Sequence, residues 1–215
     1  RPPSLILDNH PLKTVTRELA AHGQCVDLPL GYLHLEDVQC YVDTCHAASV
    51  AGPGVAALVY RRTQGHPLFM VHLVDYVAQQ VSARAPLPLD VLAGLETALP
   101  QGVRNLIEAQ LGRLTEAECQ VLEVGSVVGM VFAVGSVAAG VQMTPEAVDA
   151  VCEGLARRGQ FRDDQGLVTA PDGTVTGKHE FRHTLYVDVL YQRLSAGRRA
   201  RLHLAIGMQQ EAVYG

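Results

Sequence analysis

Residues 62–77, RTQGHPLFMVHLVDYV, combine residue types that suit contact with a ligand. Gly65, His66 and Pro67 follow one short helical pattern and open a second, strongly amphipathic one. Pro67 suits the first position of a helix, and its flat, apolar ring could pack against an adenine face. Gly65 has no side chain, so a ligand ring could approach its backbone closely. The triplet therefore has two interpretations, a tight helix–helix turn and a nucleotide contact.

A second segment resembles a phosphate-binding loop but departs from it. Residues 173–179, GTVTGKH, place three residues between the glycines where the loop needs four, and His179 replaces the hydroxyl residue. The segment is also predicted to lie in a hairpin rather than between a strand and a helix. Phosphate binding is not expected there, and no GxSxG or HExxH motif indicates a catalytic centre.

The five cysteines contain no CxxC pair. An odd count without that spacing argues against a disulfide framework or a zinc knuckle and favours a reducing cytoplasm. Cys40, Cys45 and His46 look like metal ligands, but Cys40 and Cys45 are five positions apart. Neighbours on a helix face are three or four positions apart, so no metal site is expected.

The composition is that of a globular protein with one large domain or two small ones. The 215 residues are 48% hydrophobic and 18% charged, with a net charge of −5. An acidic chain attracts nucleic acid and anionic membranes poorly. No apolar run reaches the length of about 18 residues that a membrane span needs, and no signal peptide is visible. Because the chain starts with Arg1 and ends in a helical pattern, it is expected to be a piece of a longer protein.

The pattern along the chain is mainly helical. Helices are predicted over residues 8–23, 35–46, 55–63, 67–81, 101–114, 114–129, 143–159, 184–194 and 195–213. A short strand is predicted over 24–30, a flexible stretch over 47–54 and a proline-rich linker over 82–90. Residues 160–183 predict a β-hairpin. The helices over 101–114, 114–129 and 143–159, followed by this hairpin, make a winged-helix layout.

Two basic groups could contact DNA. Arg157 and Arg158 end the helix that would read bases, whereas base reading usually begins at the other end of that helix, where Glu146 lies. Arginines at a helix end also suit the helix dipole. We therefore favour a solvated helix end, and DNA binding through this segment is not expected. The second group comprises Arg198, Arg199 and Arg201.

Five segments carry a resemblance to a known family: HPLKTVTRELAAHGQCVDLPL, RRTQGHPLFMVHLVDYV, VRNLIEAQLGRL, PDGTVTGKHEFRHTLYVDVLYQRL and RRARLHLAIGMQQEAVYG. Together they resemble the rear half of STAND-type signalling ATPases, which are AAA-related switches of large bacterial regulators. The resemblance implies that residues 1–30 end a P-loop core and that 31–90 form a helical lid. It also implies a winged-helix domain over 100–194 and the start of a helical-repeat arm over 195–215. The implied fold is mainly α, a helical lid followed by a winged helix with a small β-hairpin wing.

The resemblance also implies a nucleotide site. The family's GxP motif, whose proline contacts the adenine of ATP or ADP, matches Gly65-His66-Pro67. Its MHD-like motif, whose histidine touches the β-phosphate of ADP, matches FRHTL with His183 in that role. A histidine that merely starts a helix is the alternative for His183. Arg1 matches the family's sensor arginine.

Walker A and Walker B motifs do not occur in these residues, so the resemblance places the P-loop and the Mg²⁺ ligands before Arg1. Without them this chain alone is expected to hydrolyse no ATP, whereas the parent is expected to be an ATPase. The predicted function is regulatory, in a cytoplasmic ATP/ADP-dependent signal-transduction switch that closes over nucleotide held by the missing core. The core, the helical-repeat arm and other proteins would be its partners. The alternatives are a DNA-binding winged-helix transcriptional regulator and a protein-interaction scaffold.

Overall fold

The computed structural model describes residues 11–26, 28, 30–46, 54–83, 99–158, 161–171 and 173–215. Within these residues the protein is mainly helical, with a small three-stranded antiparallel sheet, so the predicted fold class is confirmed. The described helices are α1 Pro11–Ala21, α2 Leu35–His46, α3 Val55–Thr63, α4 Pro67–Ala83, α6 Gln101–Leu111, α7 Glu116–Val128, α8 Val134–Val141, α9 Pro145–Arg157, α10 Thr184–Arg193 and α11 Ala196–Tyr214. None of them is both long enough and apolar enough to cross a membrane.

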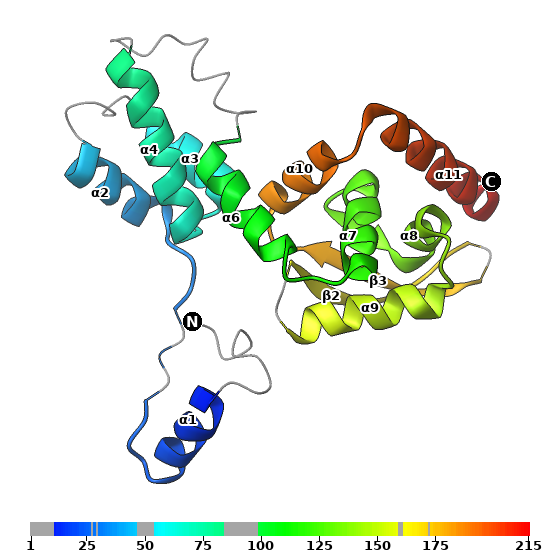
Figure 1. The fold of residues 1–215 in the computed structure, drawn as a ribbon, viewed down its shortest axis with the longest axis horizontal. Coiled ribbons are helices and arrows are strands. Elements are labelled where there is room, and N and C mark those ends of the chain that lie inside the picture. The colour runs from blue at the N-terminus through cyan, green and yellow to red at the C-terminus, as the bar shows by residue number, and fades with distance from the viewer. Residues whose placement is uncertain are drawn as a thin grey trace.

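The helices gather in two groups (Figure 1). Helices α2, α3 and α4 pack together, and α7 to α10 pack around the sheet. Helix α11 packs on α7 and α8, and α6 lies where the groups meet. Helix α1 stands apart from both groups. Most of the predicted linker and of the predicted flexible stretch lies outside the described residues.

The α2–α4 group is held together by valines at helical spacing. Val38 and Val42 on α2, Val59 on α3, and Val74 and Val77 on α4 are all buried in one apolar cluster. Spacings of three and four residues place such side chains on one face of each helix, and burying those faces drives the helices together.

The second group has a winged-helix layout. Helix α7 leads into strand β1 (Val131–Ala133), α8 and α9 follow, and β2 (Arg162–Thr169) and β3 (Val175–Phe181) form the wing. The strands lie in the order β1-β3-β2, with Val131 opposite Glu180 and Thr169 opposite Val175. The hairpin was predicted. Strand β1 and helix α8, which lie between α7 and α9, were not predicted, and Val103, Ile107 and Leu111 of α6 join the same apolar core.

Helix starts follow their side-chain caps. The Thr115 hydroxyl accepts a hydrogen bond from the backbone N–H of Glu118, and the Glu118 side chain accepts one from the backbone N–H of Thr115. Thr144 caps α9 ahead of Pro145, and Ser195 caps α11. These caps satisfy N–H groups that the first helical turn leaves without partners.

The predicted strand over 24–30 was wrong for the residues that the structure describes there. Residues 24–26, 28 and 30 belong to no strand, and Val26, Leu28 and Leu30 are exposed. Alternating residues form a strand only when a second strand pairs with them. No described strand lies against this segment, as Figure 1 shows.

Candidate functional site

The Gly65-His66-Pro67 triplet forms a tight turn between α3 and α4. Gln64 adopts the left-handed conformation, with φ of 48°, and its backbone N–H donates to the carbonyl oxygen of Tyr60. The backbone N–H of His66 donates to the carbonyl oxygen of Thr63 at 2.8 Å. Pro67 then begins α4 with its side chain exposed. The local geometry is that of the helix–helix turn, and it leaves the proline ring open to solvent.

Gly65 is required by another part of this chain. Its φ is +74°, and a Cβ added to it would lie 1.9 Å from the carbonyl oxygen of Leu33. The backbone N–H of Leu33 also donates to the carbonyl oxygen of Gly65 at 2.9 Å. The glycine therefore allows the segment before α2 to lie directly against the turn. No local sequence pattern predicts this contact.

His183 is the N-cap of α10 and is 1% exposed. Its Nδ1 accepts a hydrogen bond from the backbone N–H of Leu185 at 3.1 Å, so a neutral ring carries its hydrogen on Nε2. That Nε2 makes no hydrogen bond of ordinary geometry with the described residues, although the backbone of Thr63 lies close enough to the ring to favour its protonated form. Burial lowers the pKa of His183 to about 4; the backbone of Thr63 opposes the shift, and His66 and Arg62 add to it.

The structure brings His66 and His183 together. Their ring centroids are 6.4 Å apart, with the planes nearly perpendicular. Phe69 stacks on His66 at 4.1 Å and meets His183 edge-on at 4.9 Å. Nδ1 of His66 is likewise buried without a hydrogen bond of ordinary geometry to the described part of the chain, and burial lowers the pKa of His66. Two of the predicted site residues therefore share one cluster.

Pro67 and Arg1 complete the predicted set. Pro67 lies beside the cluster at the first position of α4, and its side chain faces solvent. Arg1 lies outside the described residues.

Sequence reasoning missed the residues that surround the histidine pair. The Tyr32 ring lies 5.4 Å from that of His66, and the Tyr186 ring lies 5.8 Å from that of Phe69. Burial raises the pKa of Tyr186 to about 12. Arg62 on α3 pairs with Asp188 on α10 at 3.5 Å, and burial raises the pKa of Asp188 although Arg62 opposes this. These contacts join residues far apart in the chain, so spacing could not indicate them.

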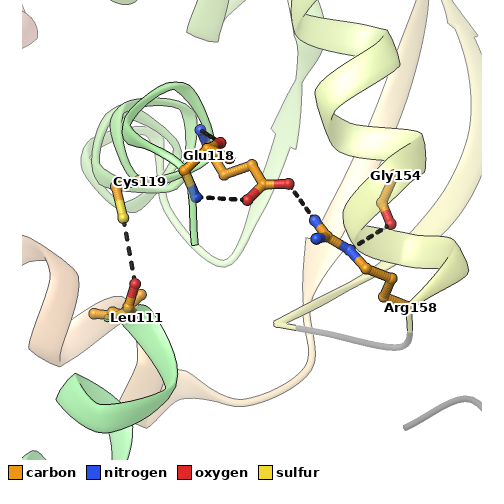
Figure 2. Close-up of polar contacts among 6 residues, drawn as sticks. Leu111, Glu118, Cys119, Gly154 and Arg158 are labelled. Carbon is orange, nitrogen blue, oxygen red and sulfur yellow. Dashed lines mark hydrogen bonds and ion pairs between the residues drawn. The ribbon is translucent and has the colours of Figure 1, made fainter. Parts of the chain in front are cut away.

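The two arginines at the end of α9 each form an ion pair with a glutamate of this chain. Figure 2 shows Arg158 reaching from the end of α9 to the carboxylate of Glu118 on α7. Burial would raise the pKa of Glu118, but the Thr115 backbone N–H and Arg158 together lower it. Arg157 pairs with Glu153 at 3.7 Å. Arg158 is therefore held against α7, whereas the Arg157 side chain stays largely exposed beside Glu153.

Two arginines of the other basic group, Arg198 and Arg199, contact residues of the preceding helices. Arg198 lies 3.0 Å and Arg193 3.7 Å from the carboxylate of Glu123, a largely buried residue of α7. The Arg199 guanidinium lies over the ring of Tyr191, 4.9 Å from its centroid. These arginines hold α7, α10 and α11 together.

Residues 175–179 of the segment that resembles a phosphate loop belong to β3. His179 is buried, and its Nε2 lies 3.2 Å from the carboxylate of Asp149 on α9. Lys178 points to solvent from the extended strand. Successive backbone N–H groups of a strand point to opposite sides and cannot surround one phosphate.

No family model, curated protein or solved structure matches this chain.

Proposed function

We propose that this chain is the regulatory part of a nucleotide-dependent signal-transduction switch and that His183 senses the nucleotide. The observation that carries the proposal is the buried Nε2 of His183, which makes no hydrogen bond of ordinary geometry with the described residues, although the backbone of Thr63 interacts with the ring. Buried polar groups nearly always have a hydrogen-bond partner, so an exception at a helix start indicates a partner that arrives from outside.

A phosphate oxygen of bound ADP fits the chemistry of this group. The low pKa of His183 keeps the ring neutral, and Nδ1 is already engaged by the N–H of Leu185. The ring therefore has one N–H to donate, at Nε2, and a phosphate oxygen accepts such bonds. Arg62 lies close enough to His183 to lower its pKa and would add positive charge beside the phosphate.

Access to His183 requires movement. Because its side chain is 1% exposed and lies against His66 and Phe69, a phosphate could reach Nε2 only if the start of α4 moved away from α10. Nucleotide binding would thus favour a second arrangement of the two helix groups. A ligand shifts such an equilibrium only by its differential affinity for the two arrangements.

The adenine would lie on the same turn. The ring of Pro67 is exposed beside the histidine cluster and is available to pack on a flat base. Gly65 fixes this turn against Leu33, so the residues before α2 would move with it. A movement of the turn on nucleotide exchange would therefore reach both α4 and the residues before α2.

In this proposal a P-loop core on the amino-terminal side supplies the Walker motifs and Mg²⁺, and a helical-repeat arm continues from α11. The parent is then a cytoplasmic bacterial ATPase, and this chain alone turns over no ATP. The DNA-binding alternative has less support, since Arg157 and Arg158 are paired with glutamates.

The test uses the parent protein and a variant that retains the helix cap. Ser is also a good N-cap, so His183→Ser should leave the start of α10 intact while removing the imidazole that reaches the phosphate. We expect this variant to bind ADP more weakly. His203→Ser, on the exposed side of α11, is the matched control.

A further inference from the structure

We propose that the contact between the starts of α4 and α10 is a proton-sensitive latch, in which proton uptake by His183 releases α10 from the turn before α4. The latch operates without nucleotide, so it does not depend on the proposed nucleotide site.

The position of the proton follows from the hydrogen bond that His183 makes. Nδ1 accepts from the backbone N–H of Leu185, so the hydrogen of the neutral ring is on Nε2. A second proton can go only to Nδ1. Two donors would then face one another, and α10 would lose its cap.

The added charge would also be poorly placed. His183 is buried against Phe69, and Arg62 on α3 already carries a positive charge nearby. Burying a second cation next to the first is unfavourable unless an anion compensates it. Moving α10 away from the turn would let water reach the imidazolium.

The other titratable groups around the contact do not supply a free anion. They are His66 on α4, Tyr32 before α2, Tyr186 and Asp188 on α10, and Arg182 before α10. Asp188 is paired with Arg62, and burial raises its pKa, so acid would also remove the negative partner that ties α3 to α10. Protonation of His66 would add a third positive charge. Each of these changes opposes the closed contact.

Hydrogen exchange of the 215-residue chain without nucleotide tests the latch. Protection factors are measured for the first-turn amides of α10 and α4 and for the amides at the buried centre of α7, each corrected for intrinsic exchange. The readout is the ratio of the first set to the second. If the opened form binds one proton with the ordinary histidine pKa of about 6.5, opening should increase about tenfold between about pH 7.5 and about pH 5.5. An unchanged ratio, or loss of α7 protection in step with α10, would overturn the proposal.

Two variants assign the effect to the imidazole. His183→Ser keeps a capping oxygen and cannot titrate, so its opening should not change over this pH range. His203→Ser should behave as the unaltered chain does. The same pH dependence in His183→Ser as in the unaltered chain would overturn the proposal. If His183→Ser does not fold near neutral pH by circular dichroism, His183→Asn, another capping residue, takes its place with the same expected result.

Discussion

The ring of His183 meets the ring of His66 edge-on, with centroids 6.4 Å apart, although the two residues stand at the starts of different helices. Each ring has a buried nitrogen that makes no hydrogen bond of ordinary geometry with the described residues, although the backbone of Thr63 interacts with the His183 ring and the backbone of His66 with its own ring. Most proteins avoid that arrangement, because an unsatisfied buried polar group costs about 1–3 kcal/mol. The contact between the two helix groups therefore buries polar atoms at a cost in free energy that ordinary apolar packing does not have.

The first prediction concerns acid stability. The pKa of His183 is lowered to about 4, so the unfolded chain binds a proton before the folded chain does. Stability is then unaffected by this group above about pH 6.5 and falls as the pH drops from there to about 4, by about 3 kcal/mol in all. Urea denaturation at several pH values measures this loss. His183→Ser should lack this component, and parallel losses in both proteins would contradict the assignment.

The second prediction concerns the turn. Gly65→Ala would combine a strained positive φ with a Cβ placed 1.9 Å from the Leu33 oxygen. Gly54→Ala is the matched control, because its φ of +97° is also strained but no described atom outside its immediate neighbours lies within 4 Å of the added Cβ. We expect Gly65→Ala to lower the free energy of unfolding by at least about 2 kcal/mol more than Gly54→Ala. Equal losses would show that the Leu33 contact is dispensable.

The third prediction concerns the docking of α11. Glu123→Gln would leave Arg193 and Arg198 without their carboxylate. Because that carboxylate is largely buried, we expect a loss of about 2 kcal/mol and faster hydrogen exchange in the first turns of α11. Glu153→Gln breaks the exposed pair with Arg157 and should cost less than about 0.5 kcal/mol. A silent Glu123→Gln would mean that apolar contacts alone hold α11.

The fourth prediction concerns DNA. Since Arg157 pairs with Glu153 and Arg158 with Glu118, we expect no appreciable DNA affinity at physiological salt. Fluorescence anisotropy with labelled duplexes measures this. A salt-dependent affinity that disappears in Arg157→Ala and Arg158→Ala would favour the winged-helix regulator instead.

Helices with clear end signals could be predicted from the sequence. The predicted bounds of α2 and α3 agree with the structure, and Thr115 and Thr144 correctly marked the starts of α7 and α9. Strand β1 and helix α8 were missed because residues 130–142 are nearly all small or apolar and show neither alternation nor a helical period. The prediction of a strand over 24–30 was wrong although these residues do alternate, because no described strand pairs with them.

The structure bears on the predicted site residues only through their positions. Gly65, His66 and His183 were chosen for their motifs, and His66 and His183 do lie together. What could not be predicted is that the backbone of Leu33 requires Gly65, or that Arg62 pairs with Asp188 across the contact. Both are contacts between segments that are far apart in the chain. Such contacts produce no periodic pattern in the sequence of either segment.

The central claim is that His183 contacts bound nucleotide, and titration of the purified parent protein with a fluorescent ADP analogue tests it most directly. We expect His183→Ser to weaken binding about tenfold or more, as loss of a hydrogen bond to a charged group does, while His203→Ser binds normally. Unchanged affinity in His183→Ser, or a parent that binds no nucleotide at all, would contradict the account.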